Sequence, residues 1–242
     1  MSDYSYLSKY YDSLTGNVDY DRRADFLVEK IKLQNGITVL DAGCGTGSMT
    51  KLLLERGFDL IGVDNSPEML TIAREKNPDA LLLCQDLSDL DLYGTVQCVI
   101  CLQDTLNHIK DLDTVAACID KFSLFLEQNC LLIFDINSLY KHQIVLGNNS
   151  FVLENDNVIC AWRNEYNCAD DSVRMQLDLF YSENGKNYLR NTEIIKEIYI
   201  SQSWIEKTLD TSGFIIEEII DGDRYIPTDD KTERIMYIAR KK

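Results

Sequence analysis

The chain has 242 residues, a formal net charge of −16 at pH 7 and 45% apolar residues. This length suits one large α/β domain, or one domain with a small cap, and the apolar content is ordinary for a globular protein. The negative charge argues against extended contacts with a phosphate backbone, so we expect no nucleic-acid partner. Apolar runs stay well short of the roughly 20 residues of a membrane helix, so we expect no membrane partner.

The eight cysteines predict reduced thiols in a cytoplasmic protein, because the first residues are polar and rich in tyrosine and do not read as a secretory leader. Cys98 and Cys101 form a C-x-x-C pair, but on a predicted strand. Side chains three positions apart on a strand point to opposite faces, so this pair cannot hold one metal ion. No second pair has the spacing of a zinc site, and we expect no bound metal.

An arm of residues 1–35 precedes the expected sheet, and it is unusually rich in tyrosine near its start. Residues 21–33 carry apolar side chains at mostly helical spacing, which predicts an amphipathic helix. The arm is either packed on the edge of the sheet or folded as a flap over a bound ligand. In the second case Tyr11 or Tyr20 would reach that ligand.

A buried strand, a tight glycine turn and a helix start are predicted between residues 37 and 55. The apolar run ends in Asp41, and Gly43, Gly45 and Gly47 then stand at alternate positions. Glycine suits a turn with positive φ angles and lets a ligand approach the backbone. The following helix offers free N–H groups at its N-terminus. Together these features predict a nucleotide-like cofactor.

Further short apolar strands follow at residues 58–63, 81–84, 97–102 and 131–136. Ligands of open α/β sheets bind outside the carboxyl ends of the strands, so polar residues at these ends should surround one crevice. Ser66 and Pro67 begin the helix after the second strand, and another helix is expected over about 111–127. The residues at the strand ends are Asp41, Asp64, Asp86 and the pair Gln103–Asp104.

The alternation of strands and helices stops after residue 136. Residues 137–200 contain strand-like runs without helices between them, and Asn184–Gly185 is a typical hairpin turn. This predicts an inserted antiparallel sheet, either a passive cap or a substrate lid over the strand ends. Ser201 begins a last helix. The strands 214–220 and 234–239 have no helix between them, so they must pair antiparallel.

The glycine loop, Asp64 and the pair Asp86–Leu87 have the order and separation typical of class I S-adenosylmethionine-dependent methyltransferases, and the chain resembles that family over its whole length. It is most similar to small-molecule N-methyltransferases with a β insertion after the fifth strand. The resemblance implies an α/β fold with a Rossmann-like, mostly parallel seven-stranded sheet, an antiparallel terminal hairpin and a small inserted antiparallel cap. It also implies a single domain over residues 1–242, with a core of 1–136 and 201–242 and a cap of 137–200.

The resemblance further implies S-adenosylmethionine as the cofactor and a contact with it for each of a set of residues. The arm tyrosines, Asp41, the glycine loop and Leu102–Gln103 would meet the methionine part. Asp64 would hold both ribose hydroxyls, and the others would surround the adenine. Asp41 could instead brace the loop, and Met69 could be ordinary core. The full set is Tyr11, Tyr20, Asp41, Gly43, Cys44, Gly45, Asp64, Asn65, Met69, Asp86, Leu87, Leu102 and Gln103.

The activity that the resemblance implies is methyl transfer to a small-molecule acceptor, in particular at nitrogen. Such a displacement needs proximity, alignment and a dry site more than acid–base groups, although a protonated amine must first lose its proton. His108 is the histidine nearest the expected crevice. It is a candidate general base, or else a helix-entry residue bonded to the backbone.

Other functions stay open at the level of sequence. Within the same enzyme class the acceptor could be an oxygen or a protein side chain. An NAD(P) oxidoreductase is disfavoured by the G-x-G-x-G spacing, by Asp86–Leu87 and by the terminal hairpin. A protein that holds the cofactor without transferring methyl is a third alternative. The chain has no Pro-Pro pair, so it lacks the motif of nucleic-acid amino-methyltransferases.

Overall fold

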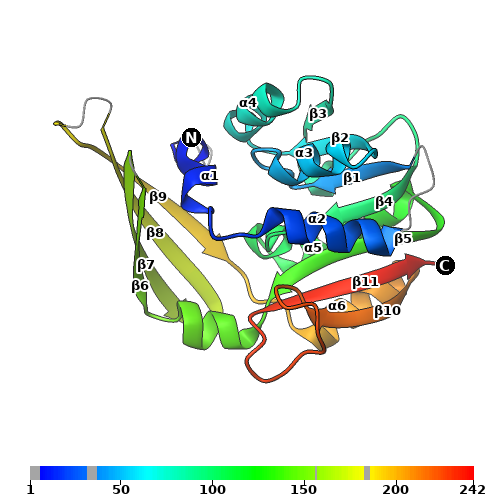
Figure 1. The fold of residues 1–242 in the computed structure, drawn as a ribbon. Helices are drawn as coiled ribbons and strands as arrows, with labels where there is room; N and C mark the ends of the chain where they lie inside the picture. The colour runs from blue at the N-terminus through cyan, green and yellow to red at the C-terminus, as the bar shows by residue number, and fades with distance from the viewer. Residues whose placement is uncertain (1–5, 32–36, 156, 183–185) are drawn as a thin grey trace.

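A computed structural model describes residues 6–31, 37–155, 157–182 and 186–242. Two sheets stand side by side (Figure 1). In the larger, seven-stranded sheet β11 runs antiparallel to both of its neighbours, and the remaining pairs are parallel. The expected α/β fold with an antiparallel terminal hairpin is therefore confirmed. The spatial order is β10 (Phe214–Asp221), β11 (Arg234–Lys241), β5 (Leu126–Asn137), β4 (Val96–Cys101), β1 (Thr38–Ala42), β2 (Asp59–Asp64) and β3 (Leu81–Cys84).

Strand β5 begins earlier than the sequence indicated. Its first five residues were expected to belong to the end of a helix or to a loop, but α5 ends at Phe125 and the strand starts at Leu126. Leu126 pairs with Val96, and the register then shifts before Cys98 pairs with Leu131. A bulge of this kind accommodates extra residues in one strand, and apolar periodicity does not reveal it.

Helices cover both faces of the larger sheet. On one face α2 (Tyr20–Ile31) and α3 (Ser48–Glu55) bury Ala24, Leu27 and Leu53 against β1, β4, β5 and β11. On the other face lie α5 (Leu112–Phe125) and α6 (Gln202–Thr211). The interpretation of α2 as a helix at the sheet edge is therefore wrong, because it lies across the face, in front of the sheet in Figure 1.

The two cysteines of the C-x-x-C pair confirm that β4 is buried on both sides. Cys98 packs in the cluster under α2 and α3, and Cys101 packs in the cluster under α5 and α6. Both side chains are fully buried. A central parallel strand with helices on both faces is expected to be mostly apolar, and β4 is apolar except for Gln97 near its start.

Short helices connect the strands at the carboxyl edge of the sheet. Ser66 is the N-cap of α4 (Pro67–Lys76), and its Oγ accepts a 3.2 Å hydrogen bond from Met69 N, as expected. The helical turns η2 (Leu87–Asp89) and η3 (Thr105–His108) follow β3 and β4. These elements begin directly after the strand ends, so their first residues face the crevice side of the sheet.

The second sheet has four antiparallel strands and confirms the expected inserted cap sheet. Its first strand was not expected. The π-helical turn η4 (Lys141–Leu146) was not expected either, since residues 137–200 were predicted to lack helices. The predicted turn at Asn184–Gly185 lies outside the described residues. The strands are, in order, β6 (Ser150–Asn155), β7 (Val158–Asn167), β8 (Ser172–Tyr181) and β9 (Leu189–Glu197).

The part of the N-terminal segment that precedes α2 lies between the two sheets (Figure 1) and is called the arm from here on. It comprises η1 (Leu7–Tyr10) and α1 (Tyr11–Leu14), and Leu7 is buried in the apolar cluster of the cap sheet. Glu193 of β9 accepts hydrogen bonds from the backbone N–H groups of Tyr6 and Leu7. The arm is thus fastened to the cap sheet. Among the described residues, no helix combines the length and the apolar character needed to cross a membrane.

Candidate functional site

A cavity of about 530 Å³ opens at the carboxyl ends of β1 to β4, and a smaller one of about 50 Å³ shares some of its lining. The structure therefore brings the predicted strand ends together around one site. Both cavities are lined by Tyr11, Gly43, Gly45 and Gln103. The larger is also lined by Asp64, Asn65, Met69, Asp86, Leu87 and His108, and the smaller by Tyr20, Asp41, Cys44 and Leu102.

The glycine loop after β1 has the left-handed backbone that its composition predicted. Gly43, Gly45 and Gly47 have φ angles of 77°, 53° and 75°. A Cβ on Gly43 would lie 2.4 Å from Cγ2 of Thr105, which stands in η3. Gly43 is therefore required both by its φ angle and by this close approach.

Asp64 ties the glycine loop to the start of α4. Its Oδ2 accepts from Gly45 N at 2.9 Å, and its Oδ1 accepts from Ser66 N at 2.9 Å. Burial raises the pKa of Asp64, and the two backbone hydrogen bonds act in the opposite direction. The carboxylate is thus held at the end of β2 by a bond to each oxygen, and Asp64 lines the larger cavity.

The larger cavity has one carboxylate and two apolar side chains around the end of β3. Asp86 caps η2 by accepting from Ser88 N at 2.8 Å. Met69 and Leu87 are both nearly buried, 4% and 8% exposed, and present apolar atoms to the larger cavity. Two apolar side chains with a neighbouring carboxylate form a surface suited to a flat ring with a polar edge.

Gln103 and Asp104 form a strained turn after β4. Both have positive φ angles, 57° and 52°, which non-glycine residues rarely adopt. Nε2 of Gln103 is buried and has no hydrogen-bond partner among the described residues. Because Gln103 lines both cavities, this amide is a donor that a bound ligand could satisfy.

The arm crosses the glycine loop close to the cavities. Oδ1 of Asp12 accepts from Thr46 Oγ1 at 2.6 Å and from Ser48 Oγ at 3.1 Å, and its Oδ2 lies 2.5 Å from Lys76 Nζ. Burial raises the pKa of the Tyr11 phenol, so that it stays neutral at ordinary pH. The arm thus places a neutral hydroxyl-bearing ring where the two cavities meet.

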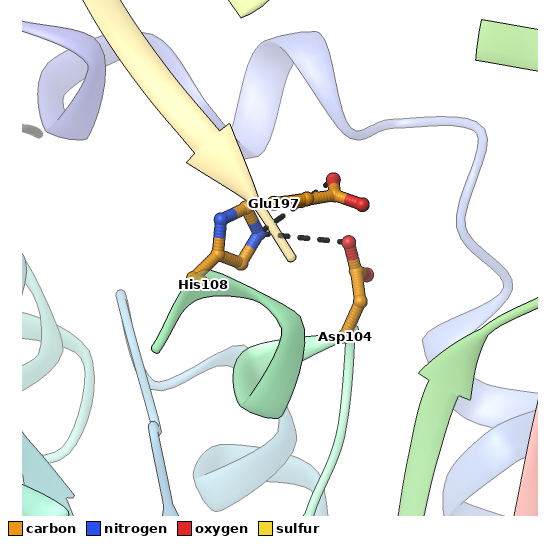
Figure 2. A group of neighbouring side chains, drawn as sticks. All are labelled: Asp104, His108 and Glu197. Carbon is orange, nitrogen blue, oxygen red and sulfur yellow. Dashed lines mark ion pairs between the residues drawn. The ribbon is translucent and has the colours of Figure 1, made fainter. Parts of the chain in front are cut away.

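A histidine and two carboxylates meet beside the larger cavity (Figure 2). His108 Nε2 lies 3.5 Å from Asp104 Oδ2 and 4.0 Å from Oε1 of Glu197, which ends β9 of the cap sheet. Burial alone would lower the pKa of His108, but the two carboxylates outweigh it and raise this pKa. The three residues are called the acid–histidine cluster below.

The carboxylates of the acid–histidine cluster have further partners. Burial would raise the pKa of Asp104, yet Arg234, 2.8 Å away, helps to hold it well below its usual range. Glu197 Oε2 accepts from Asn137 Nδ2 at 2.7 Å and lies 3.1 Å from His142 Nε2. The ligand atoms of the cluster lie within 4.8 Å of one another, as in a metal site. These existing partners explain it as a network of ion pairs and hydrogen bonds, and we assign no metal to it.

Sequence reasoning did not find Glu197, His142 or Asp12. The signal for Glu197 is present, since Glu193 and Glu197 alternate with the buried Ile195 on the face of β9 that packs inward. A carboxylate on an inward face is expected to have a specific partner. No sequence pattern marks Asp12, whose partners lie far away in the chain.

Comparisons with known proteins agree on one kind of enzyme. A family model described as "Methyltransferase domain" matches residues 39–126. The crystal structure of an S-adenosylmethionine-dependent methyltransferase from Clostridium acetobutylicum is similar over 97% of both chains, with a TM-score of 0.87 and 32% identity. A protein of Geobacillus sp. (strain WCH70) that is named as a methyltransferase is 26% identical over 245 residues, which cover 98% of this chain and 99% of that protein. A glycine/sarcosine N-methyltransferase of Parasynechococcus marenigrum (strain WH8102) is 32% identical over 54% of this chain and 50% of its own length.

Proposed function

Because this chain belongs to the class I S-adenosylmethionine-dependent methyltransferases, we propose that it methylates a nitrogen atom of a small-molecule amine. The chain is an enzyme of the transferase class, and its cofactor is S-adenosylmethionine. The cofactor supplies a methyl group that its positively charged sulfur activates. The chain's own residues must bind the two molecules, align them and handle the proton of the acceptor.

The cavity residues fit this cofactor. The positive-φ glycines leave the backbone open to a ligand, and the buried Gln103 amide lacks a partner among the described residues. We assign the nucleoside to the larger cavity, with Asp64 at the ribose hydroxyls and Asn65, Met69, Asp86 and Leu87 around the adenine. We assign the methionine half to the smaller cavity, which Tyr11, Tyr20, Asp41, Gly43, Cys44, Gly45, Leu102 and Gln103 line.

The acid–histidine cluster is the observation that carries the choice of an amine. Methyl transfer to an amine moves positive charge from the sulfur to the nitrogen, so the product is a cation. Asp104 and Glu197 place negative charge beside the cavity, and Glu197 is 3% exposed. Fixed carboxylates in a poorly solvated site stabilise such a cation, and they repel acceptors that carry a carboxylate or a phosphate near the reacting atom.

His108 is our candidate for the group that takes the proton from the acceptor's ammonium form. Asp104 and Glu197 raise its pKa, which brings it closer to the pKa of an amine and makes the proton transfer less unfavourable. The same carboxylates stabilise the imidazolium that forms. A carboxylate that orients a histidine plays this part in other enzymes.

The cap sheet and the arm are proposed to select the acceptor within a single methyltransferase domain. The cap reaches the site through Glu197, and the arm reaches it through Tyr11. The strand ends of the larger sheet are taken up by the proposed cofactor contacts. The walls left for a second molecule are therefore those of the cap and the arm.

A turnover screen tests the proposal. A set of amino sugars would be compared with their hydroxyl analogues, with release of S-adenosylhomocysteine as the readout. Glycine and sarcosine, which carry a carboxylate next to the reacting nitrogen, should turn over poorly. The expected result is turnover with at least one amine and none with the matched alcohol. Asp64→Ala is the control, since losing charge-assisted bonds to the ribose should weaken cofactor binding by about 2–4 kcal/mol. Turnover of alcohols or of peptide side chains, with none for amines, would contradict the proposal.

A further inference from the structure

The strained turn of Gln103 and Asp104 needs an explanation in the surrounding structure. Two successive non-glycine residues have left-handed φ angles of 57° and 52°. Such strain persists only where neighbouring groups hold the backbone, and it gathers at ligand sites. This turn separates β4 from η3, and through Gln103 it lines both cavities.

A buried carboxylate holds the backbone N–H groups of the turn. Asp135, in the second half of β5, is 0% exposed. Its Oδ2 accepts from Gln103 N at 3.1 Å, and its Oδ1 accepts from Asp104 N at 2.7 Å. Successive N–H groups that converge on one anion form a concave nest, and here the anion is a side chain of the protein itself.

Two buried arginines hold the carboxylate of Asp135 in turn. Arg23 of α2 bonds Oδ2 at 3.2 Å, and Arg234 of β11 bonds Oδ1 at 2.6 Å. Arg23 and Arg234 are 4% and 6% exposed. None of these three residues belongs to the described lining of either cavity. Asp135 is therefore fixed from two other elements of the fold and acts on the cavities through the turn.

The far side of the turn is fixed as well. Thr105 follows the turn, and its side chain fills the space beside Gly43. The turn is thus held between Asp135 and the glycine loop. The buried amide of Gln103, which has no partner among the described residues, lies in this held segment.

We propose that Asp135 is a positioning residue for the methionine half of the cofactor. Its carboxylate holds the Gln103–Asp104 turn in the strained shape, so that the Gln103 side chain is presented where the two cavities meet. The proposal rests on the placement of the methionine half in the smaller cavity, and it does not depend on the identity of the acceptor. Without the carboxylate the turn relaxes, and the methionine half loses its partner while the nucleoside keeps its own.

Two ligands test this proposal in the variant Asp135→Asn. S-adenosylhomocysteine carries both halves, and 5′-methylthioadenosine carries the same nucleoside without the amino-acid part. We expect calorimetry to show that the dissociation constant of S-adenosylhomocysteine rises by about tenfold or more. The dissociation constant of 5′-methylthioadenosine should change by less than about threefold. Hydrogen exchange of the Gln103 and Asp104 amides should become faster. Equal losses for both ligands, no loss for either, or unchanged exchange would overturn the proposal.

Asp178→Asn is the matched control. Asp178 is also a nearly buried carboxylate between two arginines, Arg163 and Arg190, but it lies in the cap sheet outside both cavity linings. Arg163 and Arg190 are 54% exposed, so Asp178→Asn should lose some stability, and it should keep both affinities. If Asp178→Asn showed the same selective loss of affinity for S-adenosylhomocysteine as Asp135→Asn, the loss would be a general effect of destabilisation. That result would overturn the proposal.

If Asp135→Asn does not fold, Arg23→Gln decides, because it removes one of the two arginines at Asp135 and leaves Arg234. This variant should bind S-adenosylhomocysteine about threefold more weakly and bind 5′-methylthioadenosine with unchanged affinity. Equal changes for the two ligands would overturn the proposal. If the unaltered protein binds both ligands equally tightly, the placement of the methionine half fails, and this proposal fails with it. Neither result bears on whether the acceptor is an amine.

Discussion

Thr50 of α3 donates a 2.6 Å hydrogen bond to Asp41 at the end of β1, inside the core. Asp41 is 3% exposed, and burial raises its pKa to about 6 in spite of this bond. The folded protein without a ligand therefore binds this proton more tightly than the unfolded chain does. The stability that the proton contributes is present below about pH 4 and is lost as the pH rises through about 6.

We predict that cofactor affinity depends on pH through Asp41. If the ionised carboxylate binds the ammonium group of the methionine half, S-adenosylhomocysteine must displace the proton. Its dissociation constant should then rise by about tenfold for each pH unit below about 6. Calorimetry from pH 5 to pH 8 measures this, and Asp41→Asn should give weaker binding with a flatter profile. A wild-type profile that is flat across this range would contradict the assignment.

Gly43→Ala should be far more disruptive than Gly45→Ala. Both positions have positive φ angles, but the new Cβ at position 43 meets Thr105, whereas at position 45 nothing described lies within 4 Å. We expect losses of unfolding free energy of about 2–5 kcal/mol for Gly43→Ala and about 1–2 kcal/mol for Gly45→Ala. Urea denaturation of the two variants measures this difference. Equal losses would show that Thr105 gives way easily.

His108→Asn should produce a defect that shrinks as the pH rises. If His108 takes the proton of the acceptor's ammonium, kcat/KM at pH 7 should fall by about 10²–10⁴. At high pH the amine loses its proton to solvent, so the variant should approach the wild type. The measurement is a pH profile of kcat/KM with an acceptor from the screen. His142→Asn is the control, since His142 contacts the same Glu197 but is not among the cavity-lining residues. A defect of constant size at every pH would assign His108 a structural role.

Asp12→Asn should speed the release of the bound product. Asp12 joins the arm to Thr46 of the glycine loop and to Lys76 of α4. The side chain of Asp12 is 42% exposed, so its ion pair with Lys76 contributes much less free energy than a buried ion pair would. We expect the dissociation rate of S-adenosylhomocysteine to rise by about two- to fivefold in stopped-flow experiments. Asp19→Asn serves for comparison, because Asp19 caps the start of α2 without touching the loop. Identical rates in the two variants would mean that the arm does not cover the ligand.

The parts of the fold that the sequence predicted are those governed by local rules. The glycine turn, the Ser66 cap and the antiparallel strand pair at the end depend on neighbouring residues and on short connections. The strand ends come together because parallel strands share one edge of a sheet. All the proposed cofactor residues line one or both of the two cavities.

The parts that could not be predicted depend on residues far apart in the chain. Asp135 is the acidic residue in the apolar second half of β5, and nothing local indicates that it will bond the backbone of Gln103, which lies 32 positions earlier. The ion pair of Asp12 with Lys76 and the contact of Glu197 with His108 are similar cases. Buried polar side chains on inward faces are the signal that would have directed attention to Asp135 and Glu197.

The attachment of the arm to the cap sheet also constrains the order in which the protein is made. Tyr6 and Leu7 bond Glu193, which lies 187 and 186 positions later in the chain. A ribosome releases the arm long before it releases β9, whereas β1, β2 and the glycine loop can assemble much earlier. Contacts between residues so distant in the chain form slowly, because a large loop must close. The arm can therefore bond the cap sheet only after translation has passed β9.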